Sequence, residues 1–313
     1  MNLFNEIRDG NKVSLAKGIT LLESTLDSDK KNADKLLSKC MPFSGNSIRI
    51  GITGIPGVGK STFIETFGQL LSSKGFKIAV LAIDPSSSKS HGSILGDKSR
   101  MTKLASDNNA FIRPSPTSGT LGGISNTTRE SIILCEAAGF NIILVETVGV
   151  GQSEVSVDNI VDFFLLLAIA GAGDELQGIK RGIMELADLI AITKSDGKNI
   201  INTNNTKQDY IRAIQLFPNM QNGWDRKVVT CSAIEENGID EIWDIIDIHN
   251  KKMRENGWVE TKRDQQNIYW LHHKIKEDLG NKKYIQLQKN NKIQDLEKQI
   301  KDKSISSILD KIQ

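Results

Sequence analysis

The sequence predicts an α/β fold: a mainly parallel β-sheet with helices on both faces, flanked by N-terminal and C-terminal helical extensions. Two observations support this. Short β-rich runs alternate with helical stretches through the middle of the chain, and the runs are nearly continuously apolar, as in strands buried on both faces. The predicted strands cover residues 48–53, 78–84, 142–147, 164–170, 189–194 and 227–232.

Hydrophobic periodicity divides the chain into three predicted domains. Residues 1–45 form an N-terminal helical cap, because apolar residues such as Leu15, Ile19 and Leu22 recur at helical spacing. Residues 46–250 hold the sheet. Residues 251–313 form a polar helical extension with a narrow apolar stripe, which must pack on the body of the protein or on another chain. The stripe contains Ile293, Leu296, Ile300, Leu309 and Ile312.

Composition indicates a globular protein with a real core, since 38% of the 313 residues are hydrophobic. The first 17 residues lack a continuous apolar stretch, and no run reaches the length of about 18 apolar residues that a membrane helix needs. We therefore expect a cytoplasmic protein without membrane contact. The cysteines Cys40, Cys135 and Cys231 are far apart and odd in number, which favours reduced thiols over disulfides or a zinc site.

The C-terminal extension is mildly basic. Residues 251–313 contain 15 Lys or Arg and 9 Asp or Glu, whereas the net charge of the whole chain is only +2. A basic helix can contact nucleic acid, but no aromatic stacking platform accompanies this one, so a solvated helix face is the favoured interpretation. We expect no nucleic-acid partner.

A phosphate-binding loop follows the first predicted strand, and a predicted helix over 61–73 follows the loop. Its pattern is G-x-x-x-x-G-K-S, in which backbone N–H groups face phosphates, the lysine neutralises phosphate charge and the serine hydroxyl completes a Mg²⁺ shell. A glycine turn without a nucleotide is the alternative. The loop comprises Gly54, Ile55, Pro56, Gly57, Val58, Gly59, Lys60 and Ser61.

Carboxylates end two other predicted strands. Asp84 ends the second strand, and Glu146 follows the apolar run at 142–145 and precedes Gly149. Ligands of open α/β sheets bind at the carboxyl ends of the strands, so these residues are candidates for the Mg²⁺ side of a nucleotide site. For either carboxylate alone, a helix cap or a surface ion pair would be the default interpretation.

The strand at 189–192 leads into Thr193, Lys194, Ser195 and Asp196, close to the N/T-K-x-D element that selects guanine. An aspartate accepts hydrogen bonds from guanine N1–H and the exocyclic amine together, whereas adenine offers no such donor pair. The lysine stem can cover the base. A turn with a helix cap is the alternative, but Ser232 and Ala233 later in the chain resemble the base-supporting S-A element.

Together these segments resemble the MeaB/ArgK family of P-loop GTPases. Beyond the loop at 54–62, the resemblance rests on residues 84–87 with 92–98, 113–116 with 118–123, 146–154 and 171–180. It covers the central domain from about residue 48 to 235. The succession of helical cap, GTPase domain and C-terminal extension also fits the family.

The resemblance implies roles for individual residues. Lys60 and Ser61 hold phosphate and Mg²⁺, while Asp84, Asp97 and Glu146 are candidate metal ligands. Lys60, Gln152 and Glu154 are the candidate catalytic residues, the last two in the second switch. Thr62 and Ile234 complete the site that binds GTP or GDP. The family's extra switch, which reports the nucleotide state to a partner, corresponds to Asp174, Glu175, Gln177 and Lys180.

The resemblance also implies a function. The family's members are GTPases that gate adenosylcobalamin loading into an acyl-CoA mutase, most often methylmalonyl-CoA mutase, and protect or reactivate it. Their C-terminal extension forms a homodimer. For this chain we expect a slow GTPase that a partner stimulates. Two departures stand out in this chain: Thr193 occupies the position of the usual asparagine, and Ser90-His91 replaces a Thr-Gly pair. His91 is a candidate base, although an exposed loop histidine is the favoured interpretation.

Three alternative functions remain open. The chain could be a nucleotide-switched binding module whose hydrolysis is incidental. It could be a kinase or ATPase linked to lysine, arginine and ornithine transport, although no acceptor-binding feature is visible. It could be a nickel metallochaperone GTPase, which the absence of a His-rich tract or paired cysteine ligands disfavours.

Overall fold

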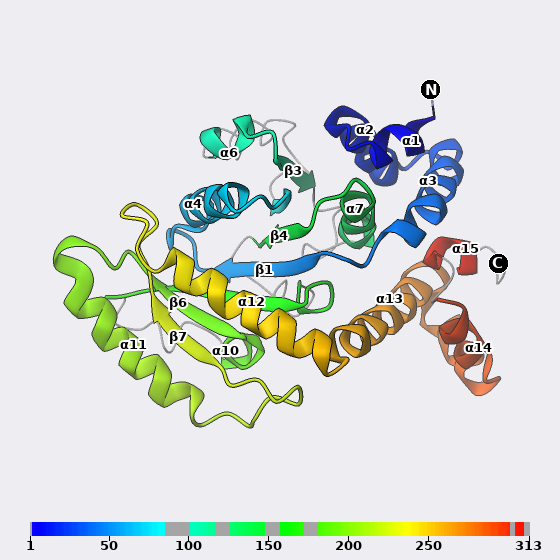
Figure 1. Ribbon diagram of the computed structural model, residues 1–313. Helices are drawn as coiled ribbons and strands as arrows, with labels where there is room; N and C mark the ends of the chain where they lie inside the picture. Colours follow the sequence, from blue (N-terminus) through cyan, green and yellow to red (C-terminus); the bar gives the residue numbers. More distant parts are fainter. Residues whose placement is uncertain are drawn as a thin grey trace. The chain divides into compact units, whose positions relative to one another are not determined.

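The computed structural model describes residues 2–84, 101–116, 126–147, 157–171, 181–300 and 304–309. The chain divides into two compact units. One unit comprises residues 1–46, 126–139 and 259–313, and the other comprises residues 47–125 and 140–258. Figure 1 shows the elements of both units coloured along the sequence.

The second unit is built on a seven-stranded sheet in the order β3-β2-β4-β1-β5-β6-β7. All its strand pairs are parallel, which confirms the predicted fold class. Strands β4 and β6 are buried at every residue, so both faces of the sheet are covered there. The strands are β1 (Ile48–Gly54), β2 (Ile78–Asp84), β3 (Ala110–Pro116), β4 (Ile142–Glu146), β5 (Phe163–Ile169), β6 (Leu189–Thr193) and β7 (Lys227–Thr230).

Strand β3 is the one strand of the sheet that the pattern of the sequence does not predict. Its residues Pro114 and Pro116 argue against a strand, because proline cannot donate to a sheet ladder. Strand β3 lies at the edge of the sheet, where proline is tolerated. The six predicted strands are present, with ends that differ from the prediction by no more than two residues.

Helices connect these parallel strands. Helix α4 begins directly after the phosphate loop and packs on α12, and α11 packs against β6 and β7. Figure 1 shows α4, the loop after β6 and the loop before α12 near the carboxyl end of β1. The helices described in this unit are α4 (Lys60–Ser73), α6 (Thr102–Ser106), α10 (Arg181–Leu186), α11 (Ile200–Ile214) and α12 (Ile239–Glu255), with the 3₁₀ turn η3 (Gly197–Asn199).

The first unit is helical. Helix α7 (Asn126–Ala137) packs against the N-terminal helices, so a segment from mid-sequence belongs to the same unit as both ends of the chain. Helix α13 (Trp258–Lys289) is kinked at Gly280, where φ is 75°. The remaining elements are α1 (Leu3–Arg8), α2 (Lys12–Glu23), α3 (Asp27–Cys40), the 3₁₀ turn η1 (Met41–Phe43), α14 (Lys292–Gln299) and α15 (Ile305–Leu309).

The apolar stripe of the C-terminal extension is buried within the chain itself. Ile293, Leu296, Ile300 and Leu309 are all at most 8% exposed, whereas Ile312 lies outside the described residues. The stripe is therefore covered by other residues of the same chain, and its burial needs no second chain. Among the described residues, no helix is both long and apolar enough to cross a membrane.

Candidate nucleotide site

The phosphate loop connects β1 to α4 and is shaped by two glycines. A Cβ atom on Gly54 would lie 2.6 Å from the carbonyl oxygen of Leu167 on the neighbouring strand β5, so only glycine lets the loop leave the sheet here. Gly59 precedes the first residue of α4 with φ of 98°, a left-handed conformation that other residues rarely adopt. The start of α4 thus directs its backbone N–H groups toward the loop, as anion binding requires.

The Lys60 side chain folds back over this loop. Its ammonium group donates hydrogen bonds to the carbonyl oxygens of Gly54 at 2.6 Å and Ile55 at 3.2 Å. An ammonium has three hydrogens, so one remains for an anion in the loop. Burial lowers the pKa of Lys60, while the negative charge of Glu146 acts in the opposite direction. A bound phosphate would supply the nearby negative charge that a partly buried ammonium needs.

Ser61 and Glu146 bring two oxygen ligands together beside Lys60. The Ser61 hydroxyl donates to a Glu146 carboxylate oxygen at 3.4 Å. Glu146 ends β4 and is 9% exposed. A hydroxyl and a carboxylate are hard oxygen donors of the kind that Mg²⁺ prefers, so both residues fit the predicted metal site.

Thr193 links the guanine element to the phosphate loop. Its buried hydroxyl lies 2.8 Å from the Val58 carbonyl oxygen in the loop and 3.1 Å from the Ala168 carbonyl oxygen in β5. A hydroxyl has one hydrogen, so these two acceptors share it. The threonine therefore contacts the loop that an asparagine amide at this position would be expected to brace.

The next residues of the guanine element are held in a constrained turn. Lys194 has φ of 57°, a left-handed conformation that costs a non-glycine residue on the order of 1 kcal/mol. The Asn199 side-chain amide donates to the Lys194 carbonyl oxygen at 2.8 Å and holds this turn. Asp196 precedes η3, but its carboxylate does not cap that turn. The helix-cap alternative therefore does not account for Asp196.

Ser232 orients the Asp196 carboxylate. The Ser232 hydroxyl donates to Asp196 Oδ2 at 2.6 Å and accepts from the Glu235 backbone N–H at 3.2 Å. The backbone N–H of Ser232 donates to the Asn237 carbonyl oxygen at 2.9 Å and closes the loop between β7 and α12. We call residues 232–237 the base loop. Asp196 thus presents its carboxylate from a fixed support, as recognition of a base edge requires.

Thr66, which belongs to none of the predicted motifs, also contacts the base loop. This residue lies on α4, and its hydroxyl donates to the Ala233 carbonyl oxygen at 3.0 Å. Ile234, the next residue of the base loop, is 80% exposed. No sequence signal marks Thr66, because its contact joins residues far apart in the chain.

The structure brings together the phosphate loop, Glu146, the guanine element and the base loop. Several predicted residues lie outside what it describes. They are the Asp84 side chain, Asp97 and His91, the second-switch residues Gln152 and Glu154, and the extra-switch residues Asp174, Glu175, Gln177 and Lys180. Asp84 ends β2, next to β4 and Glu146 in the sheet.

Comparisons with known proteins identify relatives of this chain. GTPase ArgK of Escherichia coli is 48% identical over 275 residues, which cover 88% of this chain and 83% of that protein. A mouse protein described as "Methylmalonic aciduria type A homolog, mitochondrial" is 45% identical over 287 residues, covering 88% of this chain and 69% of that one. The solved structure of an "LAO/AO transport system kinase" aligns with TM-score 0.78 and 38% identity, over 99% of this chain and 94% of the other.

A family model covers most of the sequence. Residues 15–288 match the family described as "Methylmalonyl Co-A mutase-associated GTPase MeaB". The phosphate loop, the T-K-x-D turn and the base loop all lie within the matched residues, in the geometry described above. This chain belongs to the MeaB family of P-loop GTPases.

Proposed function

We propose that this GTPase is a chaperone that gates adenosylcobalamin loading into an acyl-CoA mutase and protects or reactivates it, with methylmalonyl-CoA mutase as its client. The match of residues 15–288 to a mutase-associated family carries this proposal. The name of the mouse relative, which refers to methylmalonic aciduria, supports it. Hydrolysis is slow in the protein alone and is stimulated by the mutase.

The described geometry supports a division of roles within the site. Lys60 binds the phosphates of GTP, Ser61 and Glu146 hold Mg²⁺, and Asp196 selects guanine. Bound Mg²⁺ neutralises charge on the phosphate oxygens during phosphoryl transfer. Gln152 and Glu154, which we assign to positioning the water, and Asp97, assigned to the metal shell, lie outside the described residues.

The mutase contact is assigned to the segment after β5. Asp174, Glu175, Gln177 and Lys180 follow this strand in the sequence and carry charged and amide groups. Strand β5 pairs with β1, which enters the phosphate loop, and its Ala168 carbonyl oxygen lies beside the Thr193 hydroxyl. This connection gives the nucleotide site a physical route to the segment.

The test combines the purified protein with methylmalonyl-CoA mutase of the same organism. We expect the two to co-elute in the presence of a non-hydrolysable GTP analogue, and the mutase to increase the GTP hydrolysis rate. Lys180→Ala should keep the intrinsic rate and lose the stimulation. Lys251→Ala is the control, because the Lys251 ammonium is exposed and pairs with Asp247. If the native protein neither co-elutes nor responds, the mutase assignment is wrong.

A kinase function is the second candidate, because the solved relative at 38% identity is described as a transport system kinase. It predicts transfer of the γ-phosphate to a protein. Incubation with γ-labelled GTP and periplasmic binding proteins for lysine, arginine and ornithine distinguishes the two functions. Labelled protein would favour the kinase, and release of inorganic phosphate alone would favour the GTPase chaperone.

The cysteines do not support the nickel metallochaperone alternative. All three are buried. Burial raises the pKa of the Cys40 thiol to about 11, against a smaller opposing effect of Arg8, and that of Cys231 to about 12. Metal ligation requires the thiolate, which these surroundings disfavour. Among the described residues, no three His, Cys, Asp or Glu side chains group as metal ligands.

A homodimer and a cytoplasmic location complete the proposal. The buried stripe at Ile293 and Leu296 is not available for a dimer interface. Exposed apolar side chains remain on α13, where Ile268 is 36%, Tyr269 38% and Ile285 49% exposed. We expect sedimentation velocity to detect a dimer that Ile285→Lys weakens. The predicted domain boundaries at residues 45 and 250 stay part of the proposal.

A further inference from the structure

The base loop is anchored at two places by side-chain hydroxyls. Inside the site, Ser232 donates to Asp196, which reads the base in the proposed function. On the other side, Thr66 of α4 donates to the carbonyl oxygen of Ala233, the residue directly after Ser232. A displacement at Ala233 therefore reaches Asp196 through one adjacent residue and one hydrogen bond.

The helix that carries Thr66 also carries the phosphate-binding residues. Helix α4 begins at Lys60, and Thr66 lies six residues later, about 9 Å along the helix axis. A threonine inside a helix commonly donates to the carbonyl four residues before it, but this hydroxyl donates across to the base loop instead. One rigid element thus sets the spacing between the phosphate end of the site and the loop that supports base recognition.

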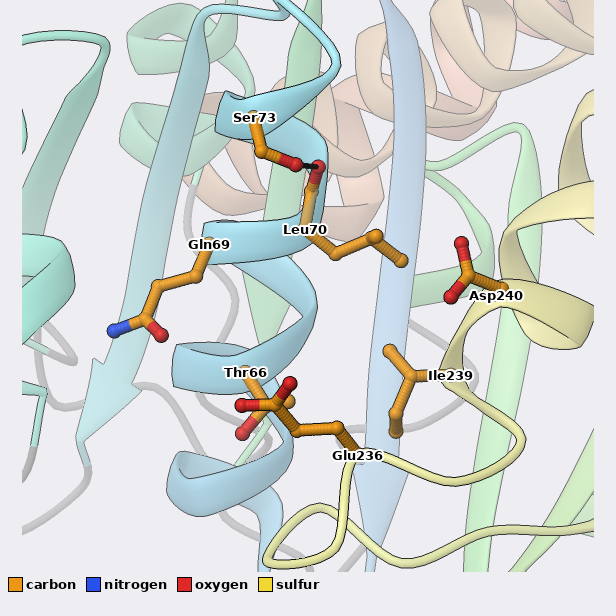
Figure 2. Close-up of a pocket in the computed structure, with 7 residues that line it drawn as sticks. All are labelled: Thr66, Gln69, Leu70, Ser73, Glu236, Ile239 and Asp240. Carbon is orange, nitrogen blue, oxygen red and sulfur yellow. Dashed lines mark hydrogen bonds between the residues drawn. The ribbon is translucent and has the colours of Figure 1, made fainter.

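An open pocket beside this contact makes the hydroxyl important. Figure 2 shows the pocket, with Thr66, Gln69, Leu70 and Ser73 of α4 on one wall and Glu236, Ile239 and Asp240 on the other. Its volume is about 290 Å³. Beyond this space the two walls are joined by the packing of Phe67 on Trp243 and by the ion pair between Lys74 and Asp240, but both contacts are made to α12 and not to the base loop. The Thr66 hydrogen bond bridges the helix and the base loop at the edge of this space.

We propose that Thr66 is a positioning residue for guanine recognition, which holds the base loop, and through Ser232 the Asp196 carboxylate, at a fixed distance from the phosphate loop. The proposal rests on the assignment of Asp196 as the base-reading residue. Thr66 itself contacts neither base nor phosphate in this role. Its effect is therefore on the choice of base rather than on phosphate binding.

The test measures the affinities of native protein and variants for GDP and inosine diphosphate by calorimetry. Inosine lacks the exocyclic amine from which the Asp196 carboxylate would accept a hydrogen bond, so the ratio of the two affinities reports the position of Asp196. Thr66→Val should lower the preference for GDP between about twofold and tenfold, the range of one neutral hydrogen bond. Thr66→Ser, which keeps the hydroxyl, should restore the native ratio.

Two other variants make the result specific. Ser73→Ala removes a hydroxyl on the same pocket wall that donates only within its own helix, to the Leu70 carbonyl oxygen (Figure 2), and should change neither affinity. Thr193→Val removes the hydroxyl beside Val58 and should weaken both ligands equally, leaving the ratio native. Melting temperatures of all variants show whether any affinity loss reflects unfolding.

The proposal is overturned if Thr66→Val keeps the native ratio, even when it weakens both ligands, or if Ser73→Ala lowers the ratio as well. If native protein binds GDP and inosine diphosphate equally and Asp196→Asn changes neither, the assignment of Asp196 is wrong too. That pattern identifies a failure of the proposed base site rather than of Thr66 alone.

Discussion

The two ends of the nucleotide site are built in different ways. The phosphate end comes from one continuous segment, Gly54 to Ser61, between β1 and α4, whose own backbone forms the binding surface. The base end joins two distant segments, the turn at Thr193 to Asp196 and the base loop, through the hydrogen bond between Ser232 and Asp196. Phosphate binding is therefore local in sequence, whereas base selection depends on tertiary contacts.

The largest expected effect breaks the phosphate end. Lys60→Met should weaken GDP binding by at least about a hundredfold, because the ammonium that forms a charged hydrogen bond to the phosphates is lost. Burial lowers the pKa of Lys60, because the charged ammonium is less stable in the folded protein than in the unfolded chain. This lowers the free energy of unfolding at pH values below the folded-state pKa, and the loss is relieved as the pH rises through that pKa. Calorimetry should thus show lost binding, without a lower melting temperature of the nucleotide-free protein.

The control for this variant is Lys74→Met at the other end of α4, where the ammonium pairs with Asp240 on the surface. It should bind GDP like the native protein. Native affinity in Lys60→Met would remove the lysine from the phosphate site. A large drop in melting temperature without nucleotide would contradict the stability argument alone.

The second effect separates base choice from phosphate binding. Asp196→Asn should weaken GDP by about a hundredfold, because an amide cannot accept both guanine hydrogens, and should improve binding of xanthosine diphosphate, whose 2-oxo group accepts from the amide. Competition calorimetry with GDP and xanthosine diphosphate measures how the relative affinity for the two nucleotides changes. Asp209→Asn on α11, an exposed residue that pairs with Arg212, is the matched control. Weakening of both nucleotides alike would contradict a role in base choice.

A smaller effect is expected where the two ends meet, at Thr193. Its single hydroxyl serves the Val58 and Ala168 carbonyl oxygens, both on buried residues. Thr193→Val should weaken GDP about tenfold, since a buried carbonyl loses its donor. Thr193→Asn supplies two amide hydrogens and should bind GDP at least as tightly as the native protein. Weaker binding by the asparagine variant would show that an asparagine amide does not replace the threonine hydroxyl in its contacts with the two carbonyl oxygens.

The sequence predicted the sheet because its strands are nearly continuous apolar runs that periodicity can detect. It did not predict β3, because Pro114 and Pro116 are atypical of a strand and are tolerated here only at the edge of the sheet. It also did not predict that α7, from mid-sequence, packs with the N-terminal helices, because nothing local in its residues specifies that contact.

The same distinction holds for the site. The phosphate loop is a spacing pattern in which each residue's role follows from its position, and the loop leads into α4 at Lys60. The hydroxyl contacts of Thr66 with Ala233 and of Thr193 with Val58 join residues 167 and 135 positions apart. Side chains of this kind carry no local signal, because only the folded sheet brings them together.

The smallest change in GDP affinity is expected where Ser232 supports the base end of the site. Ser232→Ala removes the hydroxyl that donates to Asp196 Oδ2 and accepts from the Glu235 N–H. The loss of about 1 kcal/mol should weaken GDP about fivefold, well below the effect of Asp196→Asn, because the carboxylate remains and only its support is lost. Inosine diphosphate should weaken less than GDP in calorimetry. An equal loss for both would mean that Ser232 stabilises the fold without orienting Asp196, and the base end would then depend on the backbone of its turn, as the phosphate end depends on its loop.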